Sequence, residues 1–149
     1  MLDLRQAVAA DAAAVKALTR AAYAKWVPLI GREPKPMGTD YEAAIRNHRI
    51  DLASWEGRLA GLIETIRHAD HLLIENVAVD PAFQGRGIGR ALMAHAEQLA
   101  RAQGLNEIRL YTNGKFEANI ALYLRLGYRI DREEVLPLLG IAVHMSKQQ

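Results

Sequence analysis

The residues best suited to chemistry in this chain lie in one short segment, Gln84-Gly85-Arg86-Gly87-Ile88-Gly89-Arg90. An apolar run ending in Asp80-Pro81 precedes this segment, and an amphipathic helical pattern follows it directly. The first N–H groups of a helix have no partner within the helix, and the helix dipole adds partial positive charge there. Glycines let a phosphate approach the main chain without a Cβ in its path, and arginines add full positive charge. The segment therefore predicts an anion site for a ligand that carries phosphate.

Two other phosphate-binding loops do not fit this segment. A dinucleotide-binding loop requires a third glycine where Arg90 stands, and the Gly-Lys-Ser/Thr of a P-loop occurs nowhere in the chain. The pattern that does fit is Q/R-x-x-G-x-G/A, and in this respect the segment resembles the acyl-CoA pyrophosphate loop of the GNAT N-acetyltransferase superfamily. Its place after a strand and a Pro-containing turn favours this interpretation over a purely structural glycine-rich corner. The resemblance implies acetyl-CoA as co-substrate, and it implies these CoA-binding residues: Gln84, Gly85, Arg86, Gly87, Ile88, Gly89 and Arg90.

A second segment, Asn119 to Tyr128, resembles the L-Y-x-x-x-G-F/Y signature that ends the CoA-binding fold of the same family. The resemblance implies that Tyr123 protonates the departing CoA thiolate. A thiol has a pKa of about 8.5 and a phenol one of about 10, so this proton transfer is only modestly uphill. The alternative is an aromatic ring packed on the core side of its helix. The two roles are compatible, because the ring can pack while the hydroxyl reaches a cleft.

The family comparison also predicts how the pantetheine arm of CoA is held. Family members use main-chain groups of the strand before the glycine loop, which correspond here to Val77, Ala78 and Val79. Many also carry an asparagine seven residues before the tyrosine, but this chain has Phe116 at that position. Asn119 lies on nearly the same helix face and is either a replacement for that contact or an exposed helix residue.

The acyl acceptor of such an enzyme must be a neutral amine. Deprotonating a lysine-like ammonium at pH 7 costs about 4.6 kcal/mol, whereas an α-amino group costs only about 1 kcal/mol, so a general base helps with the former. Glu75 is the first candidate, because strand alternation predicts that it shares a face with Val77 and Val79. It is equally a carboxylate that reaches the exposed end of the sheet or pairs with an arginine. His71 is a weaker candidate, and base action through a water chain is a further alternative.

The first two predicted helices and the loop between them are expected to form the acceptor pocket. Aromatic residues and charges of both signs occur there, which suits a small polar amine or amino acid and equally suits a loop packed on the core. The candidates are Tyr23, Trp26, Pro28, Arg32, Glu33, Met37, Asp40 and Tyr41.

The elements that must position these residues are read from hydrophobic periodicity and breaker residues. Strands are expected over 2–6, 50–56, 59–67, 71–79, 108–112, 128–135 and 141–146, and helices over 12–26, 41–47, 88–103 and 116–126. Asp11 and Asp40 are expected helix N-caps, Gly104 and Gly127 end helices, Gly57-Arg58 forms a hairpin turn, and residues 32–38 form a loop. The fold class is therefore α/β, a twisted mixed sheet with helices on both faces in the order β-α-α-β-β-β-α-β-α-β-β. This is the GNAT order, over a single domain spanning 1–149.

Composition bounds the function further. There is no cysteine, which excludes a thiol nucleophile and a Cys-based zinc site and fits direct transfer from thioester to amine. The net charge of +2, without a basic block, argues against nucleic-acid binding. No apolar run is long enough for a membrane span, and the first residues are too polar for a signal peptide, so we expect a cytoplasmic protein. The segment His68-Ala69-Asp70-His71 is more typical of a polar turn than of a metal site, and no metal is expected.

These observations predict an acetyl-CoA-dependent N-acetyltransferase that acts on a small-molecule amine. The alternatives are a peptide or protein N-terminal acetyltransferase and a non-catalytic acyl-CoA-binding sensor. Edge strands near the C-terminus also make a homodimer possible.

Overall fold

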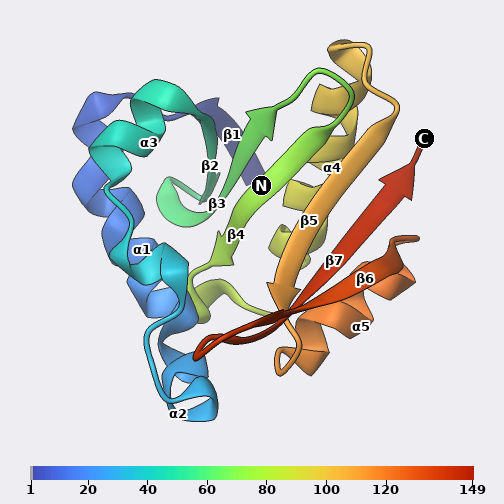
Figure 1. Ribbon diagram of the computed structural model, residues 1–149. Coiled ribbons are helices and arrows are strands. Elements are labelled where there is room, and N and C mark those ends of the chain that lie inside the picture. Colours follow the sequence, from blue (N-terminus) through green and yellow to red (C-terminus); the bar gives the residue numbers. More distant parts are fainter. Residues whose placement is uncertain (1) are drawn as a thin grey trace.

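Residues 2–149, which the computed structural model describes, form a seven-stranded mixed sheet (Figure 1). In spatial order the strands are β1 (Leu2–Gln6), β2 (Arg49–Trp55), β3 (Arg58–Arg67), β4 (Leu72–Val79), β5 (Glu107–Asn113), β7 (Gly140–Gln148) and β6 (Arg129–Leu136). All neighbours pair antiparallel except β4 and β5, which are parallel. The predicted mixed sheet is confirmed. Strands β1 and β6 form the two edges of the sheet. Pairing between subunits through such an edge, which would form the expected homodimer, stays a prediction.

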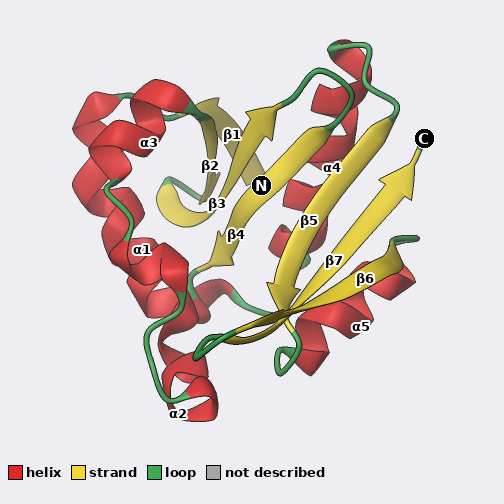
Figure 2. Ribbon diagram, in the orientation of Figure 1, coloured by secondary structure: helices red, strands yellow, loops and turns green. Residues whose placement is uncertain are grey.

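Helices cover both faces of the sheet, as predicted (Figure 2). One face carries α1 (Ala12–Tyr23) and α3 (Tyr41–Asn47), with the short α2 (Val27–Ile30) following α1, and the other carries α4 (Ile88–Ala102) and α5 (Glu117–Arg125). Each face has its own apolar cluster, because alternate residues of the central strands point to opposite sides. The helices formed by residues 2–149 lack the length and apolar character needed to cross a bilayer.

The parallel strands β4 and β5 separate soon after they begin to pair. Only Leu72, Leu73 and Ile74 of β4 have partners in β5, although both strands continue beyond this point. At the same level β4 carries a β-bulge, since Glu64 of β3 pairs with Asn76 while Thr65 pairs with Ile74, which leaves Glu75 as the extra residue. A bulge bends its strand and re-aims side chains. The central sheet is therefore open between β4 and β5 from Glu75 onward.

Several local elements differ from the prediction. Helix α1 ends at Tyr23, and a 3-10 turn (Ala24–Trp26) leads into α2, which ends at Ile30 and is capped by Gly31 with a left-handed φ of 74°. The predicted loop over 32–38 contains a 3-10 turn (Lys35–Gly38). The hairpin turn between β2 and β3 is centred on Glu56 and Gly57, because these two residues have the positive φ that a tight hairpin turn requires.

Asp11 does not cap α1, contrary to the prediction, whereas Asp40 caps α3 through the N–H groups of Glu42 and Ala43. The 3-10 turn Ala9–Asp11 already places Asp11 in a helical conformation, so its carboxylate points backward along the chain. There it accepts a hydrogen bond from the Val8 N–H at 2.8 Å and binds the Arg5 guanidinium at 2.8 and 2.9 Å.

This contact predicts a pH-dependent stability. The Arg5 guanidinium and then the Val8 N–H lower the pKa of Asp11 to about 2. Because this folded-state pKa is below the unfolded value of about 4, the stabilisation is present above pH 4 and is lost as pH falls toward 2. We expect Asp11→Asn to lower the free energy of unfolding by about 1 kcal/mol at pH 7, a modest value because Arg5 is largely exposed. Urea unfolding from pH 7 to pH 3 checks this, with exposed Asp3→Asn as control. A loss that does not shrink at low pH contradicts it.

Candidate active site

Two adjoining cavities lie beside the opening between β4 and β5. The larger, of about 310 Å³, is lined by the middle of β4, the end of β5, the segment that follows α2, and the β6–β7 hairpin. The smaller, of about 210 Å³, runs along the glycine-rich loop between the end of α1 and the starts of α4 and α5. Tyr23, Val77, Asn119 and Tyr123 line both cavities. These four residues mark the point where the two spaces meet.

The glycine-rich loop has the backbone that an anion site requires. Gly85 and Gly87 adopt left-handed conformations with φ of 79° and 76°, and Gly87 is the N-cap of α4. No side chain caps α4, so its first N–H groups are left for a ligand. The predicted residues that line the smaller cavity are Gln84, Gly85, Gly87, Ile88 and Gly89.

The two predicted arginines of the loop do not line either cavity. Arg86 is exposed, and its guanidinium lies over the rings of Trp55 and Phe83, at 5.6 and 5.3 Å from their centroids. Arg90 is exposed on the first turn of α4. The main chain at the start of α4, rather than these side chains, therefore forms the immediate wall of the smaller cavity, the predicted anion site.

The predicted pantetheine-binding residues lie where the sheet is open between β4 and β5. Val77, Ala78 and Val79 all line the smaller cavity and have no partner in β5. Tyr23 donates its hydroxyl hydrogen toward Asn76 Oδ1 at 2.8 Å and the Val77 carbonyl at 3.2 Å. The unpaired edge of β4 is therefore positioned beside the loop that begins α4.

Tyr123 projects from α5 to the junction of the two cavities. Its side chain is only 6% exposed and packs in the same cluster as α4. Burial raises the pKa of its hydroxyl to about 12, so the group keeps its proton at neutral pH. Tyr123 therefore packs in the core and also lines the cleft, and its role as the acid stays a prediction.

The residue that departs from the family pattern closes part of the cleft. Phe116 is buried at the N-cap of α5 and stacks on Trp26, with ring centroids 4.3 Å apart. Asn119, one turn along α5, is partly buried and lines both cavities. Of its two predicted environments, the structure places this asparagine in the cleft.

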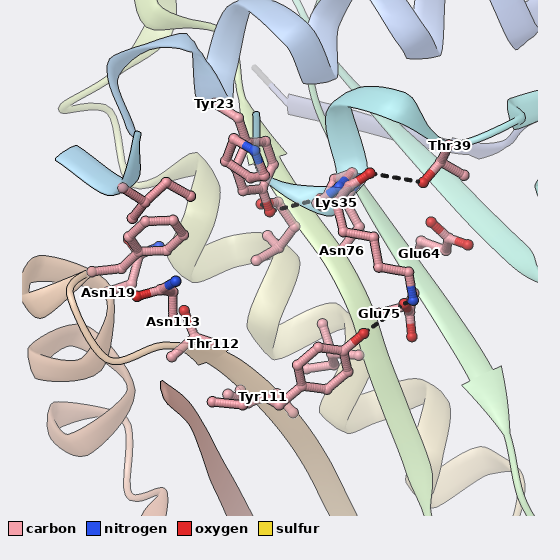
Figure 3. A pocket seen from close by; sticks show the side chains of 18 of the residues that line it. Tyr23, Lys35, Thr39, Glu64, Glu75, Asn76, Tyr111, Thr112, Asn113 and Asn119 are labelled. Carbon is pink, nitrogen blue, oxygen red and sulfur yellow. Dashed lines mark hydrogen bonds and ion pairs between the residues drawn. The ribbon is translucent and has the colours of Figure 1, made fainter. Parts of the chain in front are cut away.

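Glu75 lines the larger cavity, but the prediction that it shares a strand face with Val77 and Val79 was wrong. Val77 and Val79 pack on the α4 side of the sheet, whereas Glu75 accepts a hydrogen bond from Tyr111 at 2.9 Å on the other side (Figure 3). The β-bulge interrupts the simple alternation that the prediction assumed. Lys35 Nζ lies 3.4 Å from the same carboxylate oxygen.

His71 is not placed to act as a base. It lies just before β4, lines neither cavity, and contacts Asp70 at 2.6 Å. His68 N–H donates to the His71 carbonyl at 2.9 Å, which confirms the predicted turn.

The predicted acceptor residues divide into two groups. Tyr23, Arg32 and Tyr41 line the larger cavity, and Trp26 lines the smaller one. The other four predicted residues line neither cavity. Glu33 binds Arg20, Met37 is buried and Asp40 caps α3, and the fourth residue is Pro28.

Sequence reasoning missed several polar residues that line the larger cavity, namely Lys35, His48, Glu64, Asn76 and Tyr111. One signal was available for Glu64, a charged residue in an otherwise apolar strand, which was the same reason that singled out Glu75. The others carry no local signal, because they converge from separate elements (Figure 3).

Comparison with known proteins gives the family. The Acetyltransferase (GNAT) family model matches residues 15–128, and the chain belongs to this family of acetyltransferases. Streptothricin acetyltransferase of Streptomyces lavendulae is 32% identical over 108 residues, which cover 68% of this chain and 57% of that protein. The ribosomal protein bS18 alanine N-acetyltransferase of Escherichia coli (strain K12) is 35% identical over 72 residues, covering 48% of this chain and 49% of the relative.

The fold has close counterparts among solved structures. PaiA N-acetyltransferase from Thermoplasma acidophilum, solved in complex with coenzyme A, superposes with a TM-score of 0.81 at 17% identity, covering 100% of this chain and 99% of the other. This likeness concerns the fold. The chain spans little more than half the length of the streptothricin enzyme and about half that of the ribosomal enzyme.

Proposed function

We propose that this protein is an acetyl-CoA-dependent N-acetyltransferase that moves an acetyl group directly to a primary amine of a small molecule. The observation that carries the proposal is the position of Tyr123. Its protonated hydroxyl stands where the anion-binding cavity adjoins a second cavity lined with polar groups. Donor and acceptor can therefore approach one tyrosine from opposite sides.

The smaller cavity has the features needed to hold the CoA part of the donor. The uncapped N-terminus of α4 suits the pyrophosphate, and the left-handed Gly85 and Gly87 leave its approach free of Cβ atoms. The unpaired edge of β4 around Val77 suits the amide groups of the pantetheine arm, and Asn119 faces the same space. Arg86 and Arg90, which stand outside this wall, contribute long-range positive charge to the proposed site.

The transfer step requires one base and one acid. The neutral amine forms the new C–N bond at the acetyl carbonyl and the C–S bond breaks. We assign Glu75 as the acceptor of the amine proton, because its carboxylate lines the larger cavity. Tyr123 supplies a proton to the departing thiolate. Burial raises the pKa of the Tyr123 phenol, and burial beside it also raises the pKa of the CoA thiol. The proton transfer from the phenol to the CoA thiolate therefore stays feasible.

Contacts across the cavities favour a small acceptor over a peptide. Arg32 donates a hydrogen bond to the Leu139 carbonyl at 2.8 Å, joining the segment after α2 to the β6–β7 hairpin, whose tip reaches toward α2 in Figure 1. Trp26 stacks on Phe116 across the cleft. These contacts border a compact space rather than an open groove.

The proposal is tested first by thermal unfolding with acetyl-CoA, CoA and a longer acyl-CoA. We expect saturable stabilisation by acetyl-CoA, with an increase of about 2.7 kcal/mol in the free energy of unfolding at 100 times the dissociation constant. Thiol release in the presence of small amines and of N-terminal peptides then identifies the acceptor. No stabilisation by any CoA ester at millimolar concentration overturns the proposal, and turnover with peptides alone replaces the small-molecule acceptor.

A further inference from the structure

The inner wall of the larger cavity presents mainly hydrogen-bond acceptors. Four tyrosines line it, and three of them, all but Tyr123, commit their only hydroxyl hydrogen to another protein group. Tyr23 donates to Asn76 and Val77, Tyr41 donates to the Pro36 carbonyl at 2.6 Å, and Tyr111 donates to Glu75. Their hydroxyl oxygens therefore offer only lone pairs to a ligand.

Two carboxylates stand among these hydroxyl groups. Glu64 lies opposite Asn76 in the β3–β4 pairing, so both side chains share the face toward the cavity, and Glu75 follows from the bulge (Figure 3). Burial raises the pKa of Glu64, and the nearby charge of Glu75 raises it further. A ligand in this part of the cavity therefore meets negative charge and lone pairs.

Only one of the two carboxylate oxygens of Glu64 has a hydrogen-bond partner among residues 2–149. Glu64 is 2% exposed, and one of its oxygens, Oε2, lies 2.7 Å from His48 Nδ1. Its other oxygen has no hydrogen-bond partner among residues 2–149, although the residue lines the cavity. A buried carboxylate without a full set of partners is costly, so a positively charged donor at this position is favoured.

Lys35 and Arg32, the lysine and the arginine that line the cavity, do not pair with Glu64. Lys35 lies against Glu75, and Arg32 donates to the Leu139 carbonyl. An α-amino acid bound here would bring its own carboxylate close to the Glu64 carboxylate, whose only ion-pair partner among residues 2–149 is His48. This arrangement disfavours anionic acceptors.

We propose that the acceptor is a diamine or a longer oligoamine, with one nitrogen at the acetyl group and a second, charged nitrogen held by Glu64 and the tyrosine hydroxyl oxygens. This inference rests on the proposed N-acetyltransfer and names its substrate class. In this arrangement His48 positions the Glu64 carboxylate through its contact with Oε2. The distance between the two nitrogens of the acceptor sets the selectivity among amines.

The test compares diamines with monoamines of the same carbon chain. Thiol release is measured with 1,4-diaminobutane and butylamine, and then with α,ω-diamines of three to six carbons. We expect kcat/KM for the preferred diamine to exceed that of its monoamine by about 30-fold, as a charged hydrogen bond predicts. Equal values for both amines across the series overturn the inference while leaving N-acetyltransfer intact. Acetyl-CoA binding without transfer to any amine overturns the proposed function as well.

A variant assigns the selectivity to Glu64. We expect Glu64→Gln to reduce the diamine-to-monoamine ratio of kcat/KM to within about threefold, mainly through the KM of the diamine. Glu133→Gln removes an exposed carboxylate of β6 and is expected to keep the wild-type ratio. A Glu64→Gln protein that binds acetyl-CoA but loses both activities equally assigns Glu64 to the reaction step and contradicts the subsite. If this variant fails to fold, the wild-type chain-length series still decides the question.

Discussion

Replacing Tyr123 with phenylalanine is expected to lower kcat by about 100-fold or more and to change acetyl-CoA affinity by no more than about twofold. The substitution removes only the hydroxyl at the junction of the two cavities and keeps the ring that packs in the core. Without the phenolic proton of Tyr123, CoA must leave as the thiolate anion, or its sulfur must take a proton from water. Steady-state kinetics, together with acetyl-CoA titration by calorimetry, separates the two effects.

Tyr128 provides a matched control for this experiment. It belongs to the same cluster, and its hydroxyl is also buried but has no partner among residues 2–149 and lines neither cavity. Tyr128→Phe is therefore expected to retain turnover and the stability of the fold. An unchanged kcat in Tyr123→Phe, or an equal loss in both variants, removes the assignment of Tyr123 as the acid.

Introducing aspartate at Gly89 is expected to weaken acetyl-CoA binding by about 100-fold, because its carboxylate takes the place of the ligand's phosphate charge. Gly89 is the second residue of α4, and a Cβ there meets only Val79 at 3.7 Å, an ordinary contact. A carboxylate in the first turn of a helix also stabilises the helix, by about 0.3–1 kcal/mol. The unliganded variant should therefore unfold at the same or a higher temperature while the ligand-induced shift disappears.

Ala94→Asp adds the same charge to α4 at an exposed position in its second turn. This variant should retain most of the thermal shift with acetyl-CoA. If Gly89→Asp also retains it, the glycine loop is a structural helix start and the anion site must lie elsewhere. A loss of affinity in both variants points instead to the overall charge of the protein.

Local chemistry explains why the glycine loop was predictable. The turn that begins α4 needs residues with positive φ and then an amphipathic helix, and both requirements are visible within a few residues of Gly85 and Gly87. The strands were recognised for a similar reason, because alternation and apolar runs are short-range patterns. The same reasoning failed at Asp11, where a short 3-10 turn changed the direction of a side chain.

The face assigned to Glu75 illustrates a different limit. Alternation along β4 holds only while the strand is regular, and the bulge depends on how β4 pairs with β3. Glu64 was overlooked because its importance depends on His48, which comes from the end of α3. Contacts such as Arg32 with Leu139, 107 residues apart in sequence, have no short-range signature at all.

The sequence by itself determined the fold class, the family resemblance, the glycine-rich start of α4 and the place of Tyr123 on a helix, because each depends on residue types at fixed short spacings. Only the tertiary structure decided which polar side chains share a cavity and which way Glu75 points. The physical reason is that cavities form between elements that pack from distant parts of the chain, and strand pairing sets their side-chain directions. The composition of the larger cavity, with its carboxylates and committed tyrosine hydroxyls, therefore emerged only in three dimensions.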